Sequence, residues 1–196
     1  MGQRLVKLIT PEIEIGTKNV VIGYGSECSN HNGMTVLGYR CNASRGDSIA
    51  IGIEAISTGS AVSIGLYTKA SNSAIAIGNV ASAYVDCISI GNNTFAGGSP
   101  SSIYARNSIV IGSGASVTGT GTIAIGHSAS ASDSGIAIGW HAKAERNSIS
   151  IGPYARSDMY DMVTFGFGEG QVASVDGSKW RLFMHKLSVG KVPYAS

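Results

Sequence analysis

The chain has 196 residues, a formal net charge of +2 and 13% charged residues, against 43% hydrophobic ones. This length predicts one or two domains. So small a net charge favours neither nucleic acid nor a strongly acidic surface as a partner. No run of 18 apolar residues is present, so we expect no membrane insertion.

Residues 1–12 mix apolar side chains with Arg4 and Lys7. We expect this segment to cap the residues that follow or to attach the chain to another protein. Its opening, residues 1–7, lacks the apolar run and the small-residue cleavage site of a signal peptide. We therefore expect either an excised part of a longer protein with an added Met, or a complete small protein assembled in the cytoplasm.

Residues 13–157 are built from one repeated phrase, which a partial copy at 158–166 follows. It reads Ser-Ala-Ile-Ala-Ile-Gly at 73–78 and Asn-Ser-Ile-Ser-Ile-Gly at 147–152. The closing glycines are 13 or 14 residues apart over most of the chain, with one longer step of 21 between Gly91 and Gly112. A fixed period of this kind indicates a repeat architecture.

Each phrase alternates β-branched and small residues, which is typical of a short strand with one buried face. The glycine suits a corner, because it adopts positive φ without a Cβ clash. A second alternating stretch and a polar turn complete the repeat. Stacked repeats predict an all-β, parallel solenoid of 13–14-residue coils, a thin rod about 50 Å long at a strand spacing of ~4.8 Å.

The residue between the two β-branched positions is small in almost every repeat. If the β-branched pair faces the interior, this residue faces outward, because successive side chains of a strand alternate. A stripe of small residues on the surface would then be an interface between identical chains. The candidate interface residues are Ala50, Ser63, Ala76, Ser89, Val110, Ala124, Ala137 and Ser150.

The phrases resemble the head repeat of the YadA-like trimeric autotransporter adhesins, which is close to Asn-Ser-Val-Ala-Ile-Gly followed by two variable residues and a small one. Matching stretches include 47–55, 73–81, 107–115 and 147–155. The resemblance covers roughly residues 13–166. It implies a left-handed parallel β-roll and a homotrimer, while function is not carried by fold alone.

Three contexts fit this resemblance. No heptad stalk or membrane anchor is visible, so we favour a bacteriophage tail fibre or virion appendage that recognises a bacterial surface glycan or protein. In that case the N-terminus would contact other virion proteins. The alternatives are the head of a bacterial cell-surface adhesin that binds host matrix or glycoprotein, and a purely structural virion decoration or connector.

Two regions supply candidate receptor-binding residues. The long step after Gly91 contains a turn, Gly-Gly-Ser-Pro, and insertions in solenoids often bind. Residues 158–196 break the repeat and predict a C-terminal β cap, a possible recognition tip where aromatic and basic residues gather. The candidates from both regions are Phe95, Tyr104, Arg106, Tyr160, Trp180, Arg181, Phe183, His185 and Lys186.

Catalytic and metal chemistry find little support. Acidic residues are sparse and show no pair suited to glycoside hydrolysis, and no nucleophile elbow or phosphate-binding loop is present. His127 and His141 occupy different repeat positions, which argues against a shared metal site. Three cysteines form no Cys-x-x-Cys pair and predict reduced thiols. We therefore expect no enzyme, no cofactor and no metal.

Overall fold

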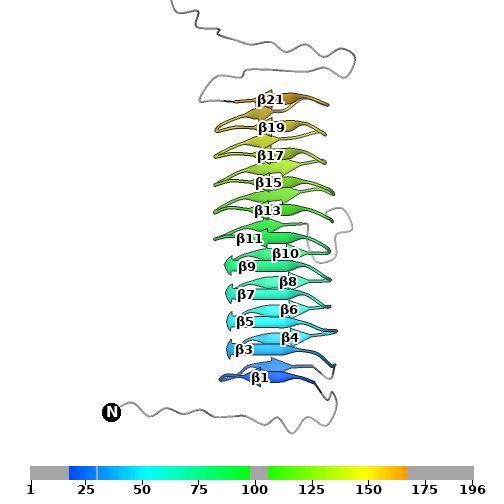
Figure 1. Ribbon diagram of the computed structural model, residues 1–196, viewed down its shortest axis with the longest axis vertical. Coiled ribbons are helices and arrows are strands. Elements are labelled where there is room, and N and C mark those ends of the chain that lie inside the picture. The colour runs from blue at the N-terminus through cyan, green and yellow to red at the C-terminus, as the bar shows by residue number, and fades with distance from the viewer. Residues whose placement is uncertain (1–17, 30, 98–105, 167–196) are drawn as a thin grey trace, which may run out of the picture.

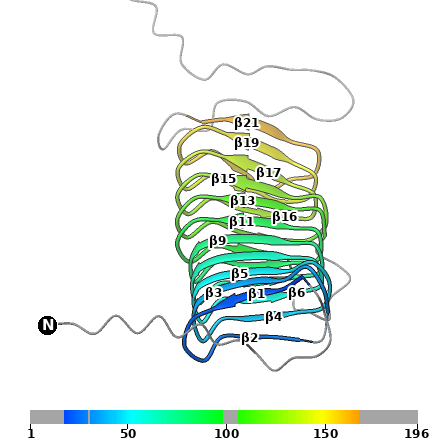
Figure 2. The same cartoon turned by 60° about the horizontal axis from the view of Figure 1, so that its bottom comes forward.

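The computed structural model describes residues 18–29, 31–97 and 106–166, and these form a solenoid without any helix (Figure 1). Every turn of the chain adds one strand to each of two sheets. One sheet has 11 strands and the other has 10, and all paired strands are parallel. Figure 2 shows the two sheets on opposite sides of a flattened roll. The predicted parallel β-solenoid is thus confirmed.

The odd-numbered strands form the first sheet, and the even-numbered strands form the second. The first sheet contains β1 (Val20–Ile22), β3 (Thr35–Tyr39), β5 (Ile49–Ile53), β7 (Val62–Leu66), β9 (Ile75–Asn79), β11 (Ile88–Ile90), β13 (Ile109–Ile111), β15 (Ile123–Ile125), β17 (Ile136–Ile138), β19 (Ile149–Ile151) and β21 (Val163–Phe165). The second contains β2 (Glu27–Cys28), β4 (Asn42–Ser44), β6 (Ile56–Thr58), β8 (Lys69–Ser71), β10 (Ser82–Tyr84), β12 (Phe95–Ala96), β14 (Ser116–Thr118), β16 (Ser130–Ser132), β18 (Lys143–Ala144) and β20 (Arg156–Ser157).

A glycine corner joins the two sheets in each coil. Gly65, for example, has a φ of 135°, and Tyr67 two residues later has a φ of 54°. The same pair of conformations recurs at Gly78 and Val80. A Cβ atom on Gly65 would collide with the backbone carbonyl of Gly78 in the next coil. Backbone conformation and close stacking therefore both require glycine here.

The opposite turn, from the second sheet back to the first, absorbs differences in coil length. Between register-equivalent buried residues, the turn advances four positions from Ser57 to Ala61 and five from Ala43 to Ser48. The strands and the glycine corner stay unchanged, which explains why coils of 13 and 14 residues stack in register. The long insertion after β12 falls in this same turn.

The interior of the roll is lined by four small residues per coil. In the coil of β9 and β10 these are Ala74, Ala76, Ala81 and Ala83, all with no exposed surface. The two sheets lie so close together that only Ala, Ser, Thr, Cys and Val fit over most of the length, and Met occurs only near the ends. Dense packing of short side chains fills this narrow core.

The predicted orientation of the first-sheet strands is therefore wrong. The small residues face the interior, and the flanking Ile and Val side chains face outward. All eight predicted interface residues are completely buried inside their own chain and cannot contact another one: Ala50, Ser63, Ala76, Ser89, Val110, Ala124, Ala137 and Ser150. The physical reason is the narrow interior, which has no room for two facing rows of isoleucine.

Polar residues in the core satisfy each other. The Ser63 and Thr68 hydroxyls are 2.8 Å apart, and Ser89 and Thr94 repeat this contact at 2.8 Å two coils further on. Buried hydroxyls without partners cost free energy, so these pairs make a partly polar core tolerable. In each case the serine lies on the first sheet and the threonine at the following corner.

No disulfide joins the three cysteines, all of which lie within the described residues. Cys41 and Cys87 are buried, and Cys28 is partly exposed. Burial raises the pKa of the Cys87 thiol above its usual value, although hydrogen bonds to Ser108 oppose this effect. Within the described residues the cysteines thus act as small core side chains.

The predicted domain boundaries remain predictions. Strands that belong to the repeat run from Val20 to Phe165, so the described solenoid extends past the predicted end at residue 157. The N-terminal segment at 1–12 and most of the predicted cap at 158–196 lie outside the described residues. The left-handed twist of the roll and the homotrimer remain predictions.

Candidate recognition surface

The outer face of the first sheet is almost entirely apolar. Its two outward columns follow the strand register, and the first column aligns Ile75, Ile88 and Ile109. The second column ends in Ile138, Ile151 and Phe165, which are 37–41% exposed. We call these two columns the isoleucine face. It runs along all 11 strands, or about 50 Å, which is unusually long for a surface left in water.

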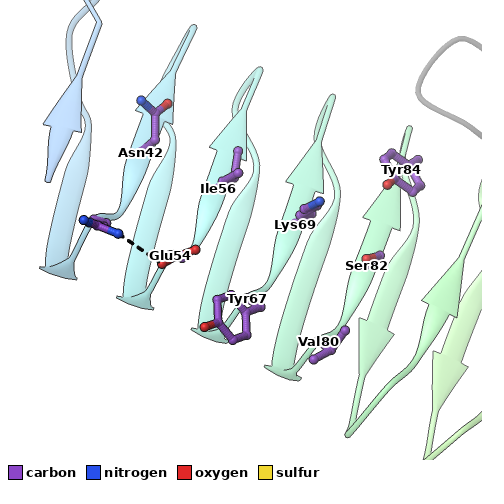
Figure 3. Close-up of a pocket in the computed structure, with 9 residues that line it drawn as sticks. Asn42, Glu54, Ile56, Tyr67, Lys69, Val80, Ser82 and Tyr84 are labelled. Atoms are coloured by element: carbon purple, nitrogen blue, oxygen red, sulfur yellow. Dashed lines mark ion pairs between the residues drawn. The ribbon is translucent and has the colours of Figure 1, made fainter. Parts of the chain in front are cut away.

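The outer face of the second sheet is different, because it mixes polar, charged and aromatic side chains. A shallow groove of about 510 Å³ crosses β4, β6, β8 and β10. We call it the sheet-two groove (Figure 3). Its floor is the register-aligned row Asn42, Ile56, Lys69 and Ser82.

The corner residues bound one side of the sheet-two groove, as Figure 3 shows for Glu54, Tyr67 and Val80. Arg40 completes this side and forms an ion pair with Glu54 at 3.9 Å. Tyr84 bounds the other side, where its ring contacts that of Phe95 with centroids 5.9 Å apart.

The charges of the groove are unequal. Arg40 and Glu54 offset each other, whereas Lys69 has no ion-pair partner within the part of the chain that the structure describes. The lining therefore carries one excess positive charge. Near the other end of the second sheet, Lys143 is neutralised by Glu145 at 2.6 Å, and this contact holds the pKa of Glu145 below its usual value.

A second exposed cluster lies on the glycine corners of three later coils. The indole N–H of Trp140 donates a hydrogen bond to Nδ1 of His127 at 3.0 Å. The rings of His141 and Tyr154 stack with an interplanar angle of 4°. Trp140 also meets Tyr154 edge-on at 4.9 Å. Neutral His127 must then carry its proton on Nε2, so neither of its nitrogens is available to a metal while this bond lasts.

Three predicted receptor-binding residues lie among the described ones: Phe95 begins β12, and Arg106 and Tyr160 precede β13 and β21. Phe95 borders Tyr84, and Tyr160 is 68% exposed beneath the Arg146 guanidinium, 5.4 Å from its ring centroid. Arg106 is exposed at the end of the insertion. Tyr104, Trp180, Arg181, Phe183, His185 and Lys186 lie outside the described residues, so their role remains a prediction.

The described coils contain no cluster of three or more His, Cys, Asp or Glu side chains arranged to hold a metal ion. The same residues contain no helix long and apolar enough to cross a membrane.

No sequence prediction pointed to the sheet-two groove. Its floor residues occupy the variable positions of the second strand, where Asn42, Lys69 and Ser82 show no common chemistry. A signal was available, however, because the third and fifth residues after each glycine are small and therefore face inward. The residue between them, such as Lys69, must then face outward.

No protein-family model matches the chain, and no curated protein matches it in sequence. Among solved structures, the chain is similar to the collagen-binding domain of the Yersinia adhesin YadA. The two share 23% sequence identity over 68% of this chain and 77% of that chain, with a TM-score of 0.44. The assignment as a parallel β-solenoid rests on the strand register of the chain itself.

Proposed function

We propose that this chain is the head of a trimeric surface adhesin, which attaches its carrier to a ligand without catalysis. The observation that carries the proposal is the contrast between the two sheets. The isoleucine face is a continuous apolar surface, whereas the second sheet presents charged and aromatic side chains to solvent.

The isoleucine face supports self-association. A thin roll with a core of alanine and serine buries little apolar surface of its own. Packing isoleucine faces against each other would bury the larger side chains as well. The number three comes from the resemblance of the repeats to YadA-like heads. If three copies were arranged about one axis, the second sheet of each copy would remain open to solvent.

Multivalency would explain how a shallow groove can support tight attachment. Three identical grooves on one rigid rod bind a repetitive surface much more tightly than one groove does, because later contacts form at high effective concentration. This mechanism needs no deep pocket and no reacting group.

The proposal has two versions, which differ in whether a bacterial cell or a phage particle displays the chain. A bacterial cell-surface adhesin would recognise host matrix or glycoprotein, and we place this version first because the repeats resemble that family. A phage fibre would recognise the surface of a bacterium.

Fluorescent beads coated with the chain test the proposal. We expect the beads to adhere to mammalian cell monolayers or to purified extracellular matrix at least tenfold more than beads coated with albumin. Adhesion to bacterial cells alone would select the phage version. If the beads bind none of these surfaces, while the chain on them retains its native fold by circular dichroism, the attachment function is wrong.

A further inference from the structure

We propose that the sheet-two groove binds a short acidic oligosaccharide, with Lys69 holding a sugar carboxylate and Tyr67 stacking on a sugar ring. The inference rests on the proposed attachment function and names the ligand class of one of its surfaces. The groove crosses four strands, about 14 Å at a spacing of ~4.8 Å, and its volume of about 510 Å³ is within the usual range for ligand sites.

Charge selects an acidic ligand. Lys69 projects from the middle of the groove floor with no acidic partner among the described residues, as Figure 3 shows beside Ile56 and Ser82. The charged pair Arg40 and Glu54, 3.9 Å apart, offset each other and add no net charge to the groove. A carboxylate in the groove would receive charge-assisted hydrogen bonds from Lys69.

Aromatic and polar side chains select a sugar. The ring of Tyr67 is 48% exposed and offers a face on which the C–H groups of a pyranose ring can stack. Tyr84 bounds the opposite side and is held by Phe95. Asn42 and Ser82 supply donors and acceptors for sugar hydroxyls from the same floor.

Backbone geometry argues against a peptide. Extended peptides are commonly bound by adding a strand to a free sheet edge. Each strand beneath the groove is paired on both sides, since β4, β6, β8 and β10 are interior members of the second sheet. The groove therefore offers side chains only, which suits a ligand that is recognised through hydroxyl and carboxylate groups.

The chain contains a matched control for each key residue. Lys143 occupies the same outward column of the second sheet as Lys69, but lies outside the groove and is paired with Glu145. Tyr154 occupies the same corner position as Tyr67, with a φ of 58° against 54° and a similar exposure of 46%. Asn93 adopts this conformation naturally, with a φ of 52°, so asparagine is a suitable replacement at both corners.

The experiment measures binding of the full chain to immobilised trigalacturonate, with its trimethyl ester as the uncharged counterpart and tetraglutamate as an acidic peptide. We expect the acid to bind at least tenfold more tightly than the ester. Lys69→Gln should weaken binding at least fivefold and Tyr67→Asn at least tenfold. Lys143→Gln and Tyr154→Asn should stay within twofold of the unmodified chain.

Several results would overturn the inference. These are equal binding of acid and ester, tetraglutamate binding as tight as trigalacturonate, or equal losses in the groove variants and their controls. Circular dichroism confirms that each variant is folded, and a native mass is recorded for each sample. If the chain is a folded trimer that fails to bind trigalacturonate, the saccharide site is refuted and the trimer is not. If the chain is a folded monomer, the trimer of the proposed function is refuted, and the saccharide site is judged by the affinity ratios of acid to ester and of variant to unmodified chain.

Discussion

At the scale of single residues, the glycine column depends on contacts between coils. Gly78 has a φ of 139°, and a Cβ atom there would collide with the carbonyl oxygen and carbon of Gly91. The colliding atoms are backbone, which cannot move without separating two coils. Substitution here therefore combines an unfavourable conformation with a steric clash.

We predict that Gly78→Ala lowers the free energy of unfolding by more than about 4 kcal/mol or prevents folding, because both penalties add. Gly121→Ala is the control. Gly121 also has a positive φ, 69°, but a Cβ atom there meets nothing within 4 Å. It should cost only about 1–2 kcal/mol. Urea denaturation at one protein concentration measures both, and equal losses would contradict the stacking argument.

The polar pairs of the core give a second test at this scale. Thr68→Ala removes the partner of the buried Ser63 hydroxyl, so it should cost about 1–3 kcal/mol. The double variant Ser63→Ala, Thr68→Ala should recover part of this loss, because it restores the all-alanine arrangement of the coil at Ala76 and Ala81. A double variant whose loss equals the sum of the single losses would show that the two hydroxyls do not depend on each other.

At the scale of the coil, the repeat behaves as an independent stacking unit. In the register, Ile136 lies above Ile123 and below Ile149. Removing residues 136–148, one coil of 13, would bring Ile149 into the position of Ile136. Both sheets would then continue without a break.

We therefore predict that deletion of 136–148 leaves a shorter rod that unfolds cooperatively, because solenoid stability is roughly a sum over neighbouring units. Deletion of 136–142, which removes the first-sheet strand and the corner but keeps β18, should abolish cooperative unfolding. Circular dichroism during thermal denaturation measures both variants. Equal damage from the two deletions would show that the coil is not the structural unit.

The sequence predicted the coil correctly, but it predicted incorrectly which side chains of the first-sheet strands face the interior. Period, strand pairs and the glycine corner were predictable, because each depends on local pattern. The orientation of the strands was predicted incorrectly, since alternation such as Ile75, Ala76 and Ile77 reads equally well with either face inward. The distance between the sheets decides the orientation, and it depends on Ala81 and Ala83 in the facing strand.

The candidate site was less predictable than the fold. The sheet-two groove is lined by four successive coils, of which the first, third and fourth contribute Arg40, Tyr67 and Tyr84, and no short motif connects these residues. Phe95, at the margin of the groove, was predicted as a binding residue because it is an aromatic residue in the stretch that holds the insertion. The ring contact between Trp140 and Tyr154 likewise joins residues of successive corners, which no short motif connects.

At the scale of the whole molecule, the proposed assembly depends on the isoleucine face. An apolar surface that extends along every strand of a sheet is stable in water only when it is covered. Copies of the same chain are the proposed cover, and the second sheet then remains exposed for binding. The account of attachment depends on this arrangement.

The native mass of the purified chain in dilute buffer is the most direct test. We predict a species of three times the 20.1 kDa chain mass, and a shift toward monomer when Ile111 and Ile138 on the isoleucine face are both replaced by lysine. Replacing Ser130 and Ser116 on the second sheet by lysine serves as the control and should leave the trimer intact. A folded, soluble monomer of the unmodified chain would contradict the shared isoleucine face and the trimeric adhesin built on it.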